Sequence, residues 1–244
     1  MPFNNAASAS NIQRVIITGA SKGLGKAIAE KFAAAGHHLF LCSRNEQQLQ
    51  ATRQELQGKY SNDNIEIMAV DISHKENAVA FGNFCLQSGT PDILVNNAGS
   101  FLPGSIHTEK ENVFETMLAV NLHSAYHLTR TVLPAMMEAK NGHIFNMCSI
   151  ASLDAYENGG SYSISKFALL GFNKNLRHEL MQYNIKVTAV IPGAVYTDSW
   201  SGSGIDPARI MEANDVAALV YAASLLSPQA CVEEIVLRPQ LGDL

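Results

Sequence analysis

Short apolar runs alternate along the chain with longer segments whose apolar residues recur at helical spacing. The runs are rich in valine and isoleucine, so we expect buried strands at 14–18, 38–42, 65–70, 91–95, 143–147, 185–191 and 232–237. The segments between them predict helices at 26–35, 45–56, 75–87, 113–139, 161–182 and 215–226. Alternating strands and helices are typical of a parallel sheet covered on both faces. The pattern therefore predicts an α/β fold with a doubly wound parallel sheet.

One domain accounts for this pattern, because no linker, internal repeat or change of composition interrupts it. We expect a single domain over residues 13–244, preceded by a flexible arm over residues 1–12. The arm is polar and lacks the apolar stretch of a secretory signal. Four well-separated cysteines indicate reduced thiols. Together these features predict a cytoplasmic protein.

Composition and charge narrow the range of partners. Hydrophobic residues make up 47% of the 244 residues and charged residues 16%, which suits a well-buried core. A net charge of −5 without any basic run argues against nucleic acid, and no stretch approaches the roughly 18 apolar residues that span a membrane. His123 and His127 lie four residues apart without a third ligand nearby, so we expect no metal site. Composition and charge thus argue against nucleic acid, a membrane and a metal ion as partners.

Three glycines, Gly19, Gly23 and Gly25, follow the first expected strand, and a helix begins directly after them. Glycines let the backbone approach a pyrophosphate, and the helix N-terminus supplies free N–H groups and a favourable dipole. The order of strand, turn and helix therefore predicts a dinucleotide site. The same turn also contains Ser21, Lys22 and Leu24.

The end of the second expected strand bears on which dinucleotide binds. A fold of this kind that prefers NAD carries an Asp or Glu there for the ribose hydroxyls, about 20 residues past the glycines. Here the chain has Ser43 and Arg44 instead. A guanidinium can meet a 2′-phosphate with its planar fork, and Lys22 could add a second positive charge. We therefore expect NADP(H), with NADPH preferred over NADH; ordinary surface charges are the alternative.

Tyr162 and Lys166 lie four residues apart in an expected helix, with Ser149 thirteen residues before the tyrosine. Residues at i and i+4 share one helical face, with Cβ atoms about 6 Å apart. A free tyrosine ionises near pH 10, so moving that ionisation to neutral pH takes roughly 4 kcal/mol. An ammonium about 4 Å away supplies about that much at an effective dielectric near 20. The spacing predicts a proton-transfer pair, with a nearby serine hydroxyl that could hold a substrate oxygen.

Other unusual residue clusters fall at the ends of expected strands. Ligands bind parallel sheets of this kind beyond the carboxyl ends of the strands. The clusters at these ends are 19–25, Ser43-Arg44, Asp71, 96–99, Ser149 and 192–197. Their coincidence predicts one cofactor site.

These motifs resemble the short-chain dehydrogenase/reductase family along nearly the whole chain. In family order they are Thr18-Gly19-x-x-x-Gly23-x-Gly25, Asn96-Asn97-Ala98-Gly99, Asn121, Ser149 with Tyr162-x-x-x-Lys166, and Pro192-Gly193. The resemblance implies a Rossmann-like sheet of seven strands in the order 3-2-1-4-5-6-7. It also implies an enzyme that transfers hydride between NADP(H) and a carbonyl or secondary alcohol.

The resemblance assigns roles to the candidate catalytic residues. Tyr162 would protonate the carbonyl oxygen during reduction, or act as the base in the reverse direction. Lys166 would ease the ionisation of Tyr162 and bind the nicotinamide ribose. Ser149 would polarise the substrate carbonyl, and the thirteen-residue spacing favours it over Ser152 and Ser161.

Further roles follow from the same resemblance. Asn121 would hold a water in a proton relay through its backbone carbonyl; a surface helix residue is the alternative. Asp71 and Ile72 would flank the adenine, and Thr197 would lie near the carboxamide. The implied cofactor contacts beyond the glycine turn and Arg44 are Asp71, Ile72, Asn97, Ala98, Gly99, Tyr162, Lys166, Pro192, Gly193, Val195 and Thr197.

Three alternative functions stay open. Reductases of 3-oxoacyl chains on acyl carrier protein tend to carry a Gly-Gly pair beside the last strand, and the segment 236–244 lacks it. A non-catalytic NADP(H) sensor on the same fold is disfavoured because all four catalytic positions are filled. A sugar-nucleotide epimerase would carry glycines spaced Gly-x-x-Gly-x-x-Gly and a longer C-terminal domain, and neither is present.

Two expectations concern the surroundings of the site. Residues 198–214 contain the only tryptophan, Trp200, among glycines and serines, and the resemblance implies a substrate lid there. Family members form homodimers or homotetramers through the helices that carry Asn121 and Tyr162. The apolar stretches 125–137 and 167–172 are consistent with such an assembly.

Overall fold

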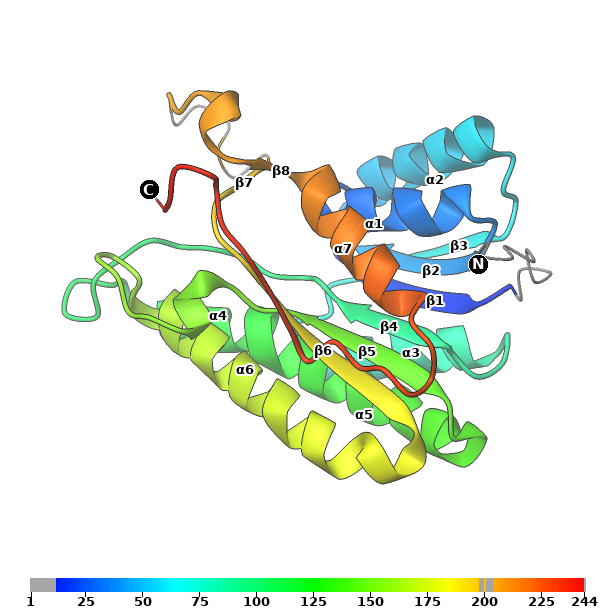
Figure 1. Cartoon of the computed structure of the whole chain (residues 1–244). Coiled ribbons are helices and arrows are strands. Elements are labelled where there is room, and N and C mark those ends of the chain that lie inside the picture. Colours follow the sequence, from blue (N-terminus) through cyan, green and yellow to red (C-terminus); the bar gives the residue numbers. More distant parts are fainter. Residues whose placement is uncertain (1–11, 198–199, 201–203, 244) are drawn as a thin grey trace, which may run out of the picture.

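Seven parallel strands form one sheet in the order β3-β2-β1-β4-β5-β6-β9 in the computed structural model (Figure 1). The structure describes residues 12–197, 200 and 204–243. The strands are β1 (Arg14–Thr18), β2 (His38–Ser43), β3 (Ile65–Ala69), β4 (Ile93–Asn96), β5 (Gly142–Met147), β6 (Ile185–Pro192) and β9 (Glu234–Leu237). The expected seven-stranded order is confirmed, with β9 as its seventh strand.

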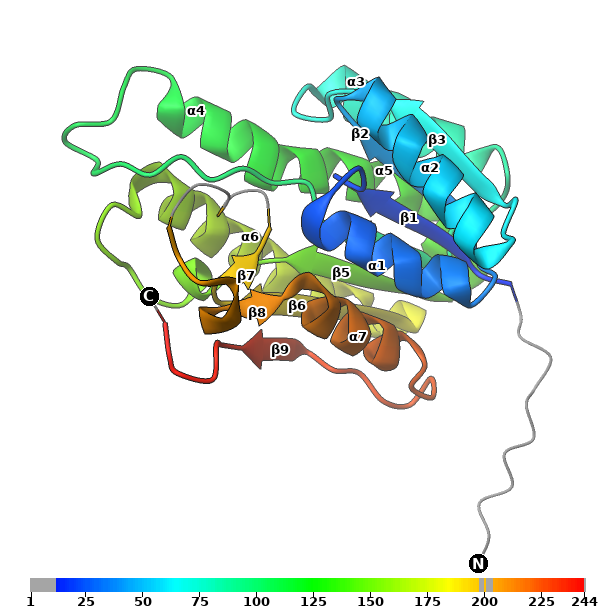
Figure 2. The same cartoon turned by 90° about the horizontal axis from the view of Figure 1, so that it is seen from above.

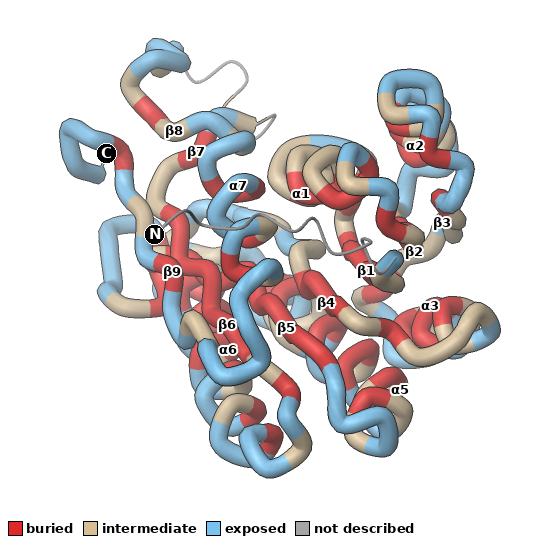
Figure 3. Tube along the Cα trace, turned by 45° about the vertical axis from the view of Figure 1, so that its right-hand side comes forward, coloured by how far each residue is buried: buried red, intermediate tan, exposed pale blue. Residues whose placement is uncertain are grey.

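Helices cover both faces of the sheet (Figures 1 and 2). One layer holds α1 (Gly23–Ala34), α2 (Glu46–Tyr60) and α7 (Ala213–Ser224). The other holds α3 (Lys75–Leu86), α4 (Val113–Leu118), α5 (Ser124–Ala139) and α6 (Gly160–Leu180). Phe32 packs in the first layer and Phe81 in the second, each fully buried. The buried stretches of Figure 3 follow the central strands, and every residue of β5 is buried.

The helical stretch expected over 113–139 is present, and it contains one irregular turn. A π-helical turn, η1 (Ala119–His123), separates α4 from α5 and contains Asn121. The side chain of Asn121 bonds to Ser100 and Ser165 on other segments, and it is almost fully buried. The apolar pattern continues through this turn, so the sequence predicts the helix but not the π-turn within it. π-turns of this kind occur frequently at functional sites.

A second sheet of two short parallel strands brings together the ends of the segment expected to be a lid. These strands are β7 (Val195–Tyr196) and β8 (Met211–Glu212), and Met211 N–H also donates to Ala194 O at 3.1 Å. Between them the short helix η5 (Pro207–Arg209) is described. The expected arm and part of the expected lid, residues 1–11, 198–199 and 201–203, lie outside the described residues.

Candidate active site

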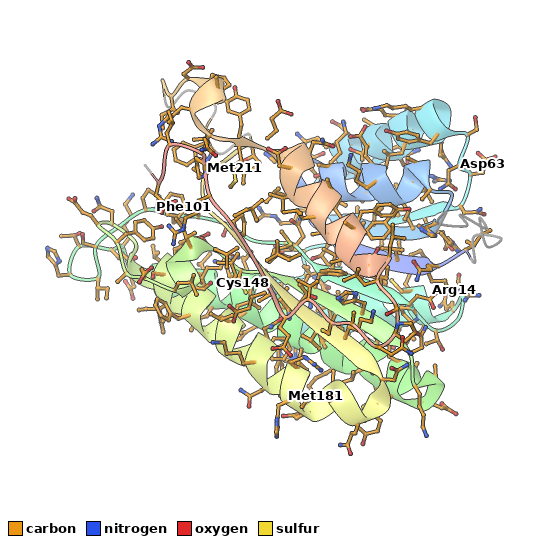
Figure 4. All side chains as sticks on the ribbon, in the orientation of Figure 1. Arg14, Asp63, Phe101, Cys148, Met181 and Met211 are labelled. Carbon is orange, nitrogen blue, oxygen red and sulfur yellow. The ribbon has the colours of Figure 1, made fainter. Side chains whose placement is uncertain are left out.

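The carboxyl ends of the strands open into one continuous cavity of about 900 Å³. Figure 4 shows Phe101 and Cys148 at this end of the sheet, opposite Arg14 at the start of β1. All residues expected to bind the cofactor line the cavity, and so does Ser149. Those residues are Gly19, Ser21, Lys22, Gly23, Leu24, Gly25, Arg44, Asp71, Ile72, Asn97, Ala98, Gly99, Tyr162, Lys166, Pro192, Gly193, Val195 and Thr197.

The glycine turn is held in shape by the end of β4. Thr18 Oγ1 accepts hydrogen bonds from the N–H groups of Asn97 and Ala98 at 3.0 and 2.9 Å. The Asn97 side chain donates to Thr18 O at 2.8 Å and to Gly19 O at 3.2 Å. A Cβ on Gly25 would overlap Gly19 O and Asn97 Nδ2, so only glycine fits there. The turn therefore places the N-terminus of α1 at the cavity in a form that suits a pyrophosphate.

Arg44 and Asp71 lie at neighbouring strand ends. Arg44 follows β2 and is exposed, and Asp71 follows β3. Asp71 Oδ1 accepts from Ser73 N–H at 3.0 Å and from Ser73 Oγ at 2.7 Å. Partial burial alone would raise the pKa of Asp71, but these hydrogen bonds and the positive charges of Arg44 and His74 outweigh burial and lower that pKa. This end of the cavity thus pairs a cation with an ionised carboxylate.

Tyr162 and Lys166 share one face of α6, as their spacing predicts. Lys166 is 6% exposed, and its Nζ donates to Met147 O, at the end of β5, at 2.7 Å. The same Nζ lies 5.8 Å from the centroid of the Tyr162 ring. An unpaired buried ammonium would be costly. The carbonyl of Met147 therefore holds this charge beside the phenol.

The hydroxyl of Ser149 is aligned by a short helical turn, η2 (Ile150–Ser152). Ser149 Oγ accepts from Ala151 N–H at 3.2 Å, while Ser149 N–H donates to Ser152 Oγ at 3.2 Å. An oxygen that accepts the Ala151 N–H keeps its own O–H as a donor. Ser149 lines the cavity, whereas Ser152 and Ser161 do not. The geometry therefore favours Ser149, the serine that the thirteen-residue spacing to Tyr162 also favours.

Asn121 lies behind the cavity wall. Its side-chain oxygen accepts from Ser100 N–H at 2.8 Å, and its side-chain nitrogen donates to Ser100 O at 3.0 Å and to Ser165 Oγ at 2.9 Å. These bonds tie the segment after β4 to α6. The Asn121 side chain thus has a structural role.

The sequence of this chain matches a known protein family, and its fold matches solved structures of other proteins. Residues 13–206 match the short chain dehydrogenase family. The chain belongs to this family. It is therefore an oxidoreductase that acts on CH–OH groups with a nicotinamide dinucleotide as acceptor.

Relatives of this short-chain dehydrogenase span almost its whole length. Sepiapterin reductase of Chlorobaculum tepidum is 34% identical over 239 residues, which cover 94% of this chain and 97% of that protein. A metagenomic short-chain oxidoreductase in complex with NADP superimposes with a TM-score of 0.81 at 33% identity, covering 93% of this chain and 97% of the other. An alcohol dehydrogenase of Thermococcus sibiricus complexed with 5-hydroxy-NADP gives 0.86 at 26% identity, covering 94% and 97%.

Several residues of this dehydrogenase line the cavity without any motif that marks them. The ring of Phe101 meets the ring of Tyr162 edge-on, with centroids 4.9 Å apart. Burial, and then the neighbouring Tyr162, raise the pKa of Tyr156 to about 12. The expected lid contributes Trp200. The sequence offered no signal for Phe101 or Tyr156, because the contacts that bring them to the site join distant segments.

The C-terminal segment also lines the cavity, which the sequence did not predict. Arg238 forms an ion pair with Asp243, and both line the cavity. Arg209, in η5, donates to the backbone carbonyls of Gly242 at 3.0 Å and of Asp243 at 3.1 Å. A Cβ on Gly193 would lie 3.0 Å from Asp243 Oδ1. The last residues of the dehydrogenase thus reach the end of the cavity at which Pro192 and Gly193 lie.

Two further properties concern the described part of the dehydrogenase. Within it, no three His, Cys, Asp or Glu side chains gather as metal ligands. Nor does any helix of that part have the length and apolar character needed to cross a membrane.

Proposed function

We propose that this chain is an NADP(H)-dependent oxidoreductase that transfers hydride between the nicotinamide and a carbonyl or secondary alcohol. One observation carries the proposal: a single cavity joins the glycine turn, Arg44 and the group of Ser149, Tyr162 and Lys166. The NADP named with two solved relatives supports the choice of cofactor. The proposal therefore rests on a site able to hold a dinucleotide beside a proton-transfer pair.

The chain's own residues fit such a cofactor. Gly25 packs against Gly19 O and Asn97 without room for a side chain, as the close packing of helix and strand in a dinucleotide-binding turn requires. Arg44 and Lys22 would bind the 2′-phosphate. Asp71 and Ile72 would flank the adenine. Asn97, Ala98 and Gly99 would support the cofactor beside the glycine turn. The remaining contacts, at the nicotinamide end, would come from Tyr162, Lys166, Pro192, Gly193, Val195 and Thr197.

Bound NADPH would supply the hydride, and the protein handles the proton. Ser149 donates its O–H to the substrate carbonyl oxygen, since its own oxygen is already engaged by Ala151 N–H. Tyr162 donates the proton that this oxygen acquires. Lys166, held by Met147 O, stabilises the phenolate left behind. The π-turn around Asn121 suits a role for its backbone carbonyl in returning a proton from water.

The fold alone does not identify the substrate, because similar folds serve different substrates. Solved relatives include enzymes named serine dehydrogenase and L-sorbose reductase. The sepiapterin reductase, a relative found by sequence, is more similar in sequence than these two. We would titrate the protein with NADPH and NADH by nicotinamide fluorescence, then follow NADPH oxidation with sepiapterin, L-sorbose and simple ketones. Tight binding of NADPH with turnover of one carbonyl supports the proposal. Binding of neither nucleotide would refute it.

We also infer that the chain assembles as a homodimer or homotetramer through α5 and α6. Three side chains of these helices, Tyr126, Ile164 and Phe167, are exposed although large and apolar. Tyr126 and Phe172 pack across the two helices, with ring centroids 5.6 Å apart, so apolar side chains of α5 and α6 meet at this surface. Light scattering should give at least twice the 26.4 kDa of one chain, and Phe167→Glu should shift the mass toward the monomer.

A further inference from the structure

Helix α6, which carries Tyr162 and Lys166, begins without an acceptor of its own. Its cap residue is Gly159 and its first residue is Gly160, and neither has a side chain to accept a hydrogen bond. The next residue, Ser161, is 2% exposed. Its N–H is therefore shielded from water and needs a partner from the protein.

Glu109 provides that partner from a different part of the chain. Its carboxylate accepts from Ser161 N–H at 2.8 Å with one oxygen and from Ser161 Oγ with the other. A carboxylate at a helix N-terminus is also favoured by the helix dipole. The match is tight, because a Cβ on Gly160 would overlap both Glu109 Oε1 and Gly104 O. Gly160 has a φ of +35°, which glycine adopts more easily than other residues.

The segment that carries Glu109 runs along the substrate end of the cavity. Its first residue, Ser100, is held by the side chain of Asn121 through two hydrogen bonds. Midway, Gly104 N–H donates to Asn158 O at 3.0 Å. Figure 1 shows this green segment beside the yellow-green turn that precedes α6. Phe101, in the same segment, contacts the ring of Tyr162.

We propose that Glu109 is a positioning residue, which caps α6 from the facing segment and so fixes Tyr162 and the wall carrying Phe101 as one unit. The role rests on the proposed reductase function, because Tyr162 acts there as the proton donor. Glu109 lies outside the cavity lining and touches no reacting atom. Its effect reaches the reaction through Ser161, the residue adjacent to Tyr162.

The test compares three variants with the wild type. Glu109→Ala removes both acceptors, while Glu109→Gln keeps an acceptor for Ser161 N–H and loses the charge. Glu111→Ala is the matched control, since Glu111 is an exposed carboxylate of the same segment. Hydrogen exchange of peptides covering 100–108 and 160–166 reports on structure without any need for activity. Steady-state kinetics with NADPH and a carbonyl substrate that wild type reduces reports on the positioning of Tyr162.

Glu109→Ala should speed exchange in both peptides and lower kcat about tenfold. Its Kd for NADPH should stay within about threefold of wild type, because no cofactor residue changes. Glu109→Gln should recover most of the kcat, and Glu111→Ala should match wild type. Unchanged exchange in either peptide, or a kcat of the Ala variant equal to wild type, would overturn the proposal. Absence of any carbonyl turnover by wild type would instead contradict the proposed function. The hydrogen-exchange rates of the two peptides would then be the only test of whether Glu109 caps α6.

Discussion

The ammonium of Lys166 lies over the ring of Tyr162, with Nζ 5.8 Å from the ring centroid. Its hydrogen bond to Met147 O fixes that position from the end of a central strand. The pair thus depends on the sheet as well as on helical spacing. A change at Lys166 should affect both the proton transfer and the cofactor ribose that it is proposed to bind.

Replacing this lysine should therefore damage two functions at once. Lys166→Met keeps the length of the side chain and removes the charge. We expect kcat to fall at least about 100-fold and Kd for NADPH to rise about tenfold, as for loss of one charged hydrogen bond. Steady-state kinetics and fluorescence titration measure the two effects. Lys174→Ala, an exposed lysine later on α6, is the control and should change neither. A loss confined to stability would count against the proposed role.

Arg44 should decide the choice between NADPH and NADH. Arg44→Asp removes the guanidinium proposed for the 2′-phosphate and adds a carboxylate that can accept from ribose hydroxyls. The Kd for NADPH should rise at least tenfold, since a hydrogen bond to a charged group contributes roughly 1.5–3 kcal/mol. The Kd for NADH should fall. Equal affinities of the wild type for the two nucleotides would show that Arg44 is an ordinary surface charge.

Gly25 should tolerate no side chain. In Gly25→Ala the added methyl would overlap Gly19 O and Asn97 Nδ2, so the turn must shift. We expect a loss of about 1–3 kcal/mol in the free energy of unfolding together with weaker NADPH binding. Gly58→Ala is the matched control, because no atom beyond its chain neighbours and the adjacent backbone of α2 lies within 4 Å of its Cβ position. It should gain up to about 1 kcal/mol through helix propensity, and a similar response of both variants would contradict this account of the turn.

His143 should make the protein less stable in acid. Burial lowers its pKa from 6.5 to about 3, and its Nε2 lies 2.7 Å from Thr188 Oγ1. The unfolded chain takes up a proton near pH 6.5 and the folded chain does not, so the unfolded state binds more protons between pH 3 and 6.5. Lowering the pH from 7 to 5 should thus cost about 2 kcal/mol of unfolding free energy at this site.

Urea unfolding of wild type and His143→Gln at the two pH values measures this cost. Gln can still donate to Thr188 and does not titrate. The variant should lose less stability in acid than wild type, although His37, whose pKa burial also lowers, keeps part of the effect. The same pH dependence in both proteins would exclude His143 as a source of it.

The sequence predicts best what short stretches determine. The apolar runs predicted the seven strands, and the family resemblance predicted the order of these strands in the sheet. Asn45 begins the helix expected over 45–56, and in the structure its side chain caps α2 by accepting from Gln48 N–H at 2.9 Å. The glycine turn was recognisable because its three glycines lie within seven residues, directly between an apolar run and a helical pattern. Such signals can be read from a short stretch, although the contacts of the turn with Asn97 cannot.

The remaining features depend on contacts between distant residues. Glu109 caps Ser161 across 52 positions, and its segment has no motif. Arg238 and Asp243 reach the cavity only because β9 joins the sheet beside β6. The π-turn at Asn121 is hidden in a helical apolar pattern, and the paired strands β7 and β8 are only two residues long. Propensity and periodicity cannot reveal such features, since tertiary packing decides them.

The most direct test of the central claim is the rate of NADPH oxidation by wild type and Tyr162→Phe at saturating NADPH, with a carbonyl that wild type reduces. Phenylalanine keeps the ring beside Phe101 and removes only the proton donor. We predict that kcat falls by about 10²–10⁴, while Kd for NADPH stays within about threefold. A Tyr162→Phe variant that turns over at nearly the wild-type rate would contradict the assignment of Tyr162 as the acid.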